Sequence, residues 1–109
     1  MMKTYPIFTY AKLKKHDLPD NTVARGVLHL LPNGDGAADF SGDGIIRGQL
    51  LHVDHKELRR IDHEELPEYE RRRILADGKP AWGYELKDHK VMEQAPVIDG
   101  GRWLPHMKD

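Results

Sequence analysis

The sequence predicts an α+β fold, a small mixed or antiparallel β-barrel with one or two short helices, formed as a single domain by residues 1–109. Short runs of β-forming residues follow one another along the chain, turn-forming residues separate them, and one amphipathic helical pattern interrupts them. A chain of 109 residues is a usual size for one domain, which buries roughly 60 to 70% of its unfolded surface. It can enclose one core and one pocket.

The predicted strands are short and mostly consecutive. Their residues are β-branched, aromatic or otherwise apolar, and the segments are Thr4 to Tyr10, Arg25 to Leu31, Ile45 to Val53, Tyr69 to Ala76 and Pro80 to Leu86. The dipeptide Asp77-Gly78 between the last two is a strong signal for a type I′ hairpin.

The segments between the strands predict loops, and the C-terminal tail predicts packing onto the barrel. Turn-forming residues are frequent in Leu13 to Asn21 and in Pro32 to Gly44. In the tail from Lys87 to Asp109, we expect burial of Val97, Ile98 and Trp103.

The helix is predicted directly after the third strand, and it carries an acid on its buried face. Leu58, Ile61 and Glu65 recur at i, i+3 and i+7, which places them on one stripe. Asp54 is the expected N-cap, with Glu57 completing a capping box. A carboxylate on an apolar face must be paired, hydrogen-bonded or partly neutral, and a raised carboxyl pKa suits proton transfer near neutral pH.

Composition excludes several classes of function. With 17 basic and 18 acidic residues the formal charge is −1, so no global charge favours nucleic acid or an anionic membrane. The chain has no cysteine, which removes disulfides, thiol nucleophiles and cysteine-based metal sites. No apolar run is long enough for a signal peptide or membrane helix, and we therefore expect a cytoplasmic protein.

A metal site and a cofactor are not expected. Possible ligands do gather around the helix, at His52, Asp54, His55, Asp62, His63 and Glu64. Their spacing does not match a zinc signature such as His-Glu-x-x-His. A metal-dependent hydrolase is therefore the weakest of the alternatives.

An ordered set of motifs resembles the gamma-glutamylcyclotransferase superfamily, especially its short bacterial members and the gamma-glutamylamine cyclotransferases. Six motifs of the family have counterparts here. They are its strand ending in Tyr-Gly-x-Leu, its Gly-Glu-Leu-Tyr strand, its helix with Leu-x-x-Leu-Asp-x-x-Glu, the two strands that follow, and its Gly-Asp-Trp. The counterparts are IFTYAKLKK (Ile7 to Lys15), GIIRGQLLHV (Gly44 to Val53), ELRRIDHEE (Glu57 to Glu65), YERR (Tyr69 to Arg72), AWGY (Ala81 to Tyr84) and GGRW (Gly100 to Trp103).

This resemblance implies a barrel with a cavity at one end and a small-molecule substrate. Family members convert a γ-glutamyl amide into 5-oxoproline and a free amine, using a glutamate as general base and acid, and Glu65 matches that glutamate. By the same comparison the turn Tyr10, Ala11, Lys12 and Leu13 would hold the substrate through backbone N–H groups, and Tyr69 would line the cavity.

Three positions depart from the family pattern and keep alternatives open. Ala11 replaces the turn glycine, Lys12 follows it and Gln49 replaces a glutamate. If the turn needs a positive φ, Ala11 is strained. Lys12 could offer a cation to a carboxylate or phosphate, but we expect it in solvent. The second hypothesis is therefore a binding module for a small molecule or protein on the same barrel. Glu65 could also be a helix-end residue paired with Arg71.

Overall fold

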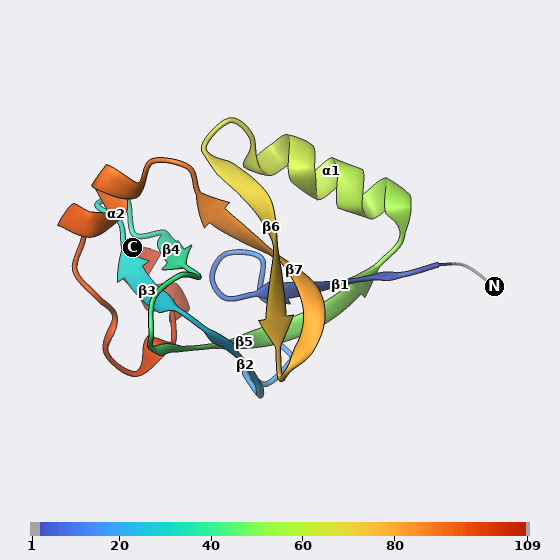
Figure 1. Ribbon diagram of the computed structural model, residues 1–109, viewed down its shortest axis with the longest axis horizontal. Helices are drawn as coiled ribbons and strands as arrows, with labels where there is room; N and C mark the ends of the chain where they lie inside the picture. The colour runs from blue at the N-terminus through green and yellow to red at the C-terminus, as the bar shows by residue number, and fades with distance from the viewer. Residues whose placement is uncertain (1–2, 109) are drawn as a thin grey trace.

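The computed structural model describes residues 3–108 and contains a closed five-stranded barrel (Figure 1). The strand order is β1-β5-β2-β6-β7, and a parallel pairing of Ile7 with Trp82 brings β7 back to β1. The other neighbours are antiparallel, and the strands are β1 (Tyr5–Thr9), β2 (Thr22–Arg25), β5 (Ile45–Val53), β6 (Tyr69–Ala76) and β7 (Lys79–Leu86). The predicted α+β barrel is confirmed.

Two further strands form a hairpin that extends the sheet beyond β7. β3 (Val27–Leu30) pairs with β4 (Gly36–Asp39), and β4 runs parallel to β7. The prediction of one strand from Arg25 to Leu31 is therefore wrong, because the chain leaves the barrel at Gly26. A Cβ there would lie 2.7 Å from the carbonyl oxygen of Asp39. The prediction that residues 32–44 form only a loop is also wrong, since it contains β4.

The helix α1 (His55–Glu65) is confirmed and lies alongside the barrel next to β6 (Figure 1). The carboxylate of Asp54 accepts a hydrogen bond from the Glu57 N–H at 2.8 Å, as an N-cap should. The Glu57 side chain pairs with Arg60.

The tail forms a second helix, α2 (His89–Gln94), and two 3₁₀ turns, Asp99–Gly101 and Pro105–Lys108. Ile98 and Trp103 are buried as expected. Burial of Val97 is wrong, since its side chain is 55% exposed. Its backbone forms an isolated bridge to His29, and side chains alternate between the two faces of such an extended segment.

The hairpin between β6 and β7 follows the predicted turn. Asp77 and Gly78 have φ values of 51° and 78°, and Ala76 pairs with Lys79, as a type I′ turn requires. Trp82 is only partly buried, and the guanidinium of Arg71 lies 4.4 Å from its ring centroid.

The core divides into two clusters on either side of β1. Phe8 faces the barrel interior, where it joins Ile46 and Trp103. Its neighbour Ile7 faces the opposite way and joins a cluster that includes Leu58 and Ile61 of α1. The second cluster anchors α1 to the outside of the barrel and fixes where its last turn ends. Within residues 3–108, no helix has the length and apolar character needed to cross a membrane.

Candidate functional site

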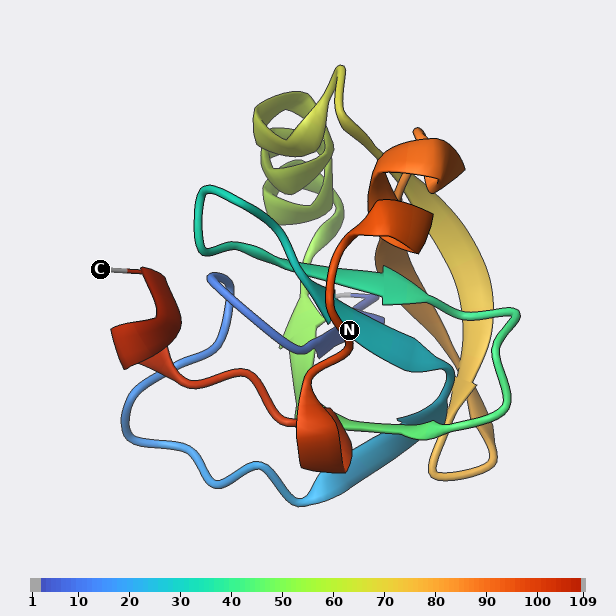
Figure 2. The ribbon, with the colours of Figure 1, turned by 90° about the vertical axis from the view of Figure 1, so that its left-hand side faces the viewer.

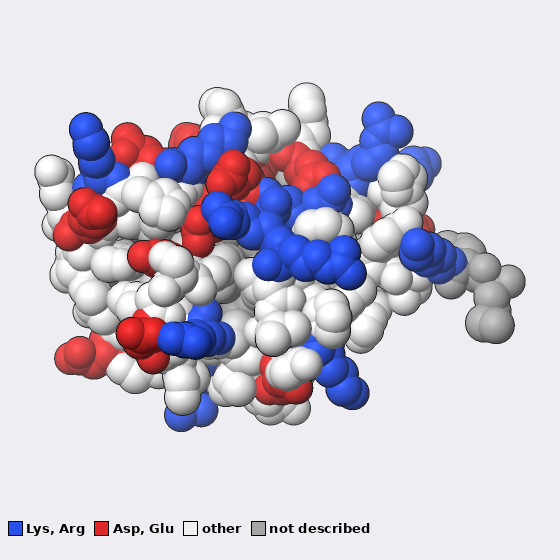
Figure 3. All heavy atoms as spheres, viewed as in Figure 1, with Lys and Arg blue, Asp and Glu red and all other residues white. Residues whose placement is uncertain are grey.

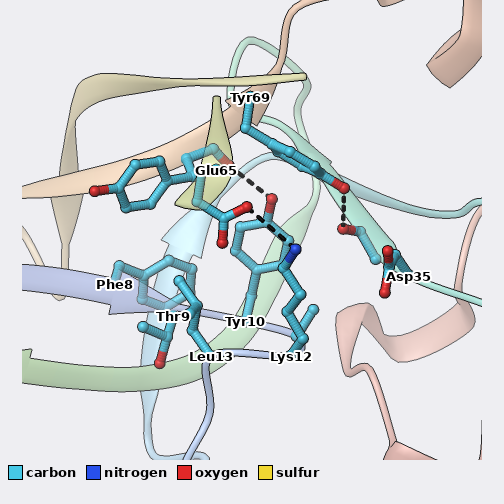
Figure 4. Close-up of a pocket in the computed structure, with 11 residues that line it drawn as sticks. Phe8, Thr9, Tyr10, Lys12, Leu13, Asp35, Glu65 and Tyr69 are labelled. Carbon is cyan, nitrogen blue, oxygen red and sulfur yellow. Dashed lines mark hydrogen bonds and ion pairs between the residues drawn. The ribbon is translucent and has the colours of Figure 1, made fainter. Parts of the chain in front are cut away.

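A pocket opens where β1 ends, beside the last turn of α1 (Figure 4). Its empty volume, which includes space open to solvent, is about 340 Å³. Segments from four parts of the chain line it, namely Phe8, Thr9, Tyr10, Ala11, Lys12, Leu13, Asp35, Gly36, Glu65, Tyr69 and Tyr84. All six residues that the sequence nominated, which are Tyr10, Ala11, Lys12, Leu13, Glu65 and Tyr69, are therefore brought together.

Glu65 is the last residue of α1, and its side chain lines the pocket while almost fully buried. The residue is 5% exposed, on the same stripe as Leu58 and Ile61. One carboxylate oxygen lies 3.3 Å from the Lys12 ammonium. Burial raises the pKa of Glu65, and Lys12 offsets part of that rise. The group therefore holds its proton more tightly than an ordinary glutamate, as desolvation of a carboxylate requires.

Glu65 does not form the alternative pair with Arg71. The Arg71 guanidinium lies 3.5 Å from Asp62, one helical turn before Glu65. Asp62 also accepts a hydrogen bond from the Tyr84 hydroxyl at 2.6 Å. Asp62 therefore ties α1 to β7.

Lys12 departs from the expectation that it lies in solvent. Its side chain is 46% exposed, but the ammonium turns back toward Glu65 and lies 5.7 Å from the ring centroid of Tyr69 (Figure 4). A partly desolvated ion pair next to an aromatic face is stronger than one in water. The position that replaces a small residue of the family turn thus supplies a cation to the pocket.

The turn that follows β1 is formed without strain at Ala11. The Ala11 carbonyl accepts a hydrogen bond from Lys14 N–H at 3.0 Å, and Ala11 is not in the positive-φ region. A Cβ on Gly36 would lie 3.0 Å from the Ala11 methyl, so the glycine on the facing strand leaves room for this methyl group. Among the hydrogen bonds of residues 3–108, none uses the N–H groups of Lys12 or Leu13.

Tyr10 lines the pocket with its ring and uses its hydroxyl to join strands. The hydroxyl donates to the Tyr84 carbonyl at 2.6 Å and accepts from Ala38 N–H at 3.3 Å. Burial raises the pKa of Tyr10 well above its ordinary value. This neutral tyrosine holds the turn against β7 and β4.

Asp35 and Gly36 are pocket residues that the sequence did not nominate. Asp35 is 8% exposed, and Lys108 and Asn33 contact its carboxylate. The Gly36 carbonyl accepts a hydrogen bond from the Tyr69 hydroxyl at 3.3 Å, and burial raises the pKa of Tyr69. The sequence showed Asp35 only as an acid within the glycine-rich Pro32 to Gly44 segment, and this pattern does not indicate which part of the barrel the residue contacts.

Gln49 supports the segment behind the turn. Its amide NH₂ donates to the carbonyls of Lys15 and Leu18 and to the carboxylate of Asp20, at 2.9, 3.0 and 3.2 Å. Its oxygen accepts from Lys15 N–H at 2.7 Å. Three of these four contacts require a donor, and an ionised glutamate has none.

The possible metal ligands around α1 do not converge. Within residues 3–108, no group of three or more His, Asp or Glu side chains is arranged to hold a metal ion. Asp54 and Asp62 are used as the helix cap and as the partner of Tyr84.

Comparisons with known proteins agree with this architecture. YkqA from Bacillus subtilis has a similar fold, with a TM-score of 0.72 and 19% sequence identity. The match covers 93% of this chain and 40% of YkqA, so the chain spans well under half the length of that protein. No curated protein matched the chain. The family model described as "Gamma-glutamyl cyclotransferase, AIG2-like" matches residues 6–105. The barrel, the pocket beside α1 and this match over nearly the whole sequence lead to one conclusion: the chain belongs to the AIG2-like gamma-glutamyl cyclotransferase family.

Proposed function

We propose that the protein converts a γ-glutamyl amide into 5-oxoproline and a free amine, with Glu65 as general base and general acid. The observation that carries the proposal is the buried Glu65 carboxylate facing a pocket, with a raised pKa. A carboxyl pKa closer to neutrality suits a group that must both accept and return a proton.

The reaction requires one proton carrier and no protein nucleophile. The substrate's own α-amine attacks its γ-carbonyl carbon, and Glu65 accepts the proton that the amine loses. The C–N bond of the amide then breaks, and protonated Glu65 gives this proton to the departing nitrogen. The products are 5-oxoproline and the amine, and Glu65 returns to its starting state.

Substrate binding is assigned to the turn after β1. The N–H groups of Lys12 and Leu13, which have no hydrogen-bond acceptor within residues 3–108, suit a carboxylate or a carbonyl oxygen. The Lys12 ammonium can move from Glu65 to the α-carboxylate of the substrate. That transfer would raise the pKa of Glu65 further when the substrate binds, because the cation that stabilises its ionised form has left.

The direct test is release of amine and 5-oxoproline from a panel of γ-glutamyl amino acids and γ-glutamyl-ε-lysine. We expect equimolar release of the two products from at least one substrate, unchanged by a chelator. Loss of activity with the chelator would support a metal-dependent hydrolase. Absence of turnover across the panel would overturn the proposed reaction.

A binding module is the second candidate, and the Lys12–Glu65 ion pair favours it. The ammonium 3.3 Å from the carboxylate neutralises the group that catalysis needs, and a protein that only holds a ligand tolerates such a pair. Equilibrium binding of γ-glutamyl compounds without product release would distinguish this candidate from the enzyme.

Replacing Lys12 by methionine is expected to shift the pH dependence of turnover. Lys12 lowers the pKa of Glu65, and the base form is active, so activity rises as pH passes through that pKa. Without the cation, the acid limb of the kcat/KM profile moves to higher pH, whereas Lys12→Arg keeps it near the wild-type position. A Lys12→Met profile that coincides with the wild type would show that Lys12 does not act on the base.

A further inference from the structure

Strand β6 has a free edge over most of its length. One side of the strand pairs with β7 from Tyr69 to Ala76. On the other side β2 pairs with it only between Ala24 and Ala76, because the chain leaves the barrel at Gly26, directly after β2. Within residues 3–108, no strand continues that side beyond this pair. β6 forms the right-hand wall of the molecule in Figure 2, where it is drawn in yellow.

The free edge presents the backbone groups of Arg71 and Arg73. In a two-residue hairpin the flanking residues, here Ala76 and Lys79, form a hydrogen-bonded pair, and bonded and non-bonded pairs then alternate along the strands. Arg72 therefore bonds to β7, whereas the N–H and C=O groups of Arg71 and Arg73 point away from it. Among the backbone hydrogen bonds of residues 3–108, none uses those groups. Such an edge can accept a further strand.

A hollow runs along this edge and shares no residue with the pocket beside α1. We call it the β6 slot. Residues 72–75 of β6 line it, together with Arg25 at the end of β2 and with Phe40 and Ser41 after β4. Its empty volume, which includes space open to solvent, is about 1020 Å³. The slot lies where a continuation of β2 would run, antiparallel to β6.

The inner face of the slot is apolar, and its charges are already paired. Phe40 and Ile74 supply the apolar surface. The side chain of Glu85 is 3% exposed, and it accepts a hydrogen bond from Phe40 N–H at 2.8 Å. Arg72 and His89 lie 3.3 and 3.1 Å from the same carboxylate. An apolar side chain therefore suits this face better than a charged one.

The outer face carries the charge that is not paired. Arg71 and Arg73 flank Trp82, and their guanidinium carbons lie 4.4 and 5.5 Å from its ring centroid. Arg71 Nη1 lies 3.5 Å from Asp62, but this buried nitrogen has no hydrogen-bond partner within residues 3–108. Arg73 is exposed, and no acid of the same residues pairs with it. Figure 3 shows basic side chains gathered over β6, with acidic side chains beside them. The uncompensated charge at the free edge is that of Arg73.

We propose that the β6 slot binds an extended acidic segment of another protein, which adds a strand antiparallel to β6. The residues opposite Arg71 and Arg73 bond to the free backbone groups and carry carboxylates on the outer face. The residue between them places an apolar side chain against Phe40. A second copy of β6 is disfavoured, because antiparallel pairing centred on any of residues 71–73 places arginine opposite arginine. The inference goes beyond the proposed reaction and does not depend on it.

The first test is calorimetric titration with acetylated and amidated peptides. We expect Gly-Glu-Val-Glu-Val-Glu-Gly to bind about three- to tenfold more tightly than the same peptide with lysine in place of glutamate, a difference that shrinks in high salt. N-methylation of the glutamates should abolish binding, because their N–H groups bond to the free edge. N-methylation of the valines should be tolerated, because their N–H groups point away from β6.

Amide hydrogen exchange locates the added strand. When the acidic peptide binds, the amides of Arg71 and Arg73 should gain protection, whereas the amide of Arg72, which already bonds to β7, should change little. This alternation separates strand addition from contact through the arginine side chains. Equal changes at all three amides would overturn the added strand.

A pair of variants tests the origin of the charge preference. Arg73→Gln should weaken binding of the acidic peptide by about two- to fivefold. Arg47→Gln is the matched control, because this exposed arginine lies on β5, outside the slot. Circular dichroism and thermal melts confirm that each variant is folded. Equal affinity for the acidic and basic peptides would overturn the assignment of an acidic partner.

Two further outcomes would assign the edge differently. If the acidic peptide does not bind at millimolar concentration and Arg73→Gln aggregates, the arginines only protect the free edge from other chains, and the proposal is overturned. Sedimentation of the free protein as a dimer, with the amides of Arg71 and Arg73 already protected, would assign the edge to a second copy and overturn it as well.

Discussion

Glu65→Gln is expected to lower kcat for 5-oxoproline formation by about 10²- to 10⁴-fold, the usual contribution of a positioned acid–base group. The amide has nearly the shape of the carboxyl group but can neither accept the proton of the attacking amine nor return it to the leaving nitrogen. Single-turnover and steady-state rates with the same γ-glutamyl substrate measure the effect. Activity that survives the substitution would assign the proton transfer to another group.

The same variant is expected to stay folded and to lose part of the pH dependence of its stability. The pKa of Glu65 is raised in the folded protein, so its favourable contribution is present below the unfolded-state pKa and is lost as pH rises through the folded pKa. At neutral pH the buried charge of Glu65 lowers the stability of the folded protein, whereas a neutral glutamine has no such cost. Thermal melts from pH 4 to 8 should show a flatter profile for Glu65→Gln.

Glu64→Gln is the control for both measurements. Glu64 precedes Glu65 on α1, and its side chain is 53% exposed and pairs with Arg60 on the surface. A surface ion pair of this kind contributes little to stability. Turnover and the pH profile should remain close to wild type. A large loss with Glu64→Gln would indicate that the helix end, rather than the carboxyl of Glu65, determines activity.

Gln49→Glu is expected to destabilise the protein by about 2 to 4 kcal/mol at pH 7, because it buries a charge and removes donors from groups that stay buried. Gln49 is 3% exposed and donates to Lys15, Leu18 and Asp20. A carboxylate would face two carbonyl oxygens and the Asp20 carboxylate at the same positions. Urea unfolding monitored by tryptophan fluorescence measures the loss.

The pH dependence and a control variant test the reason for this loss. The destabilisation of Gln49→Glu should shrink toward pH 4, where the new carboxyl gains a proton and one donor. Gln94→Glu, at the exposed end of α2, should change stability by no more than about 0.5 kcal/mol. A loss for Gln49→Glu that does not vary with pH would argue against a buried charge as its cause.

Local patterns in the sequence were enough to predict the helix and the hairpin on which the site depends. The i, i+3, i+7 spacing of Leu58, Ile61 and Glu65 gave both the helix and the buried acid, since helical geometry places these residues on one stripe. The Asp77-Gly78 turn gave the register of the longest hairpin, because few residues adopt a positive φ at two successive positions. The family motifs supplied the barrel with a cavity at one end and the turn after β1 as part of its lining.

Non-local contacts were not predictable from such patterns. β4 is a short strand composed mostly of small residues, and its sequence does not indicate a strand. It joins the sheet through its pairing with β3 and β7. Asp35 enters the pocket because that pairing brings its loop beside Tyr69, 34 residues further along the chain. Ala11 does not adopt the positive φ that would strain it, and Gly36 on the facing strand leaves room for its methyl group. None of these contacts has a periodic signal.

The sequence by itself determined the fold class, the helix and the presence of one acid on its inner face, because these follow from residue spacing within a few turns of chain. Only the tertiary structure decided the partner of that acid. Lys12 reaches Glu65 across 53 positions of sequence, Arg71 is held by Asp62, and Lys14 bonds to the carbonyl of Trp103 near the other end of the chain. Closure of the barrel brings these side chains together, and electrostatic attraction over a few ångströms then selects the pairs.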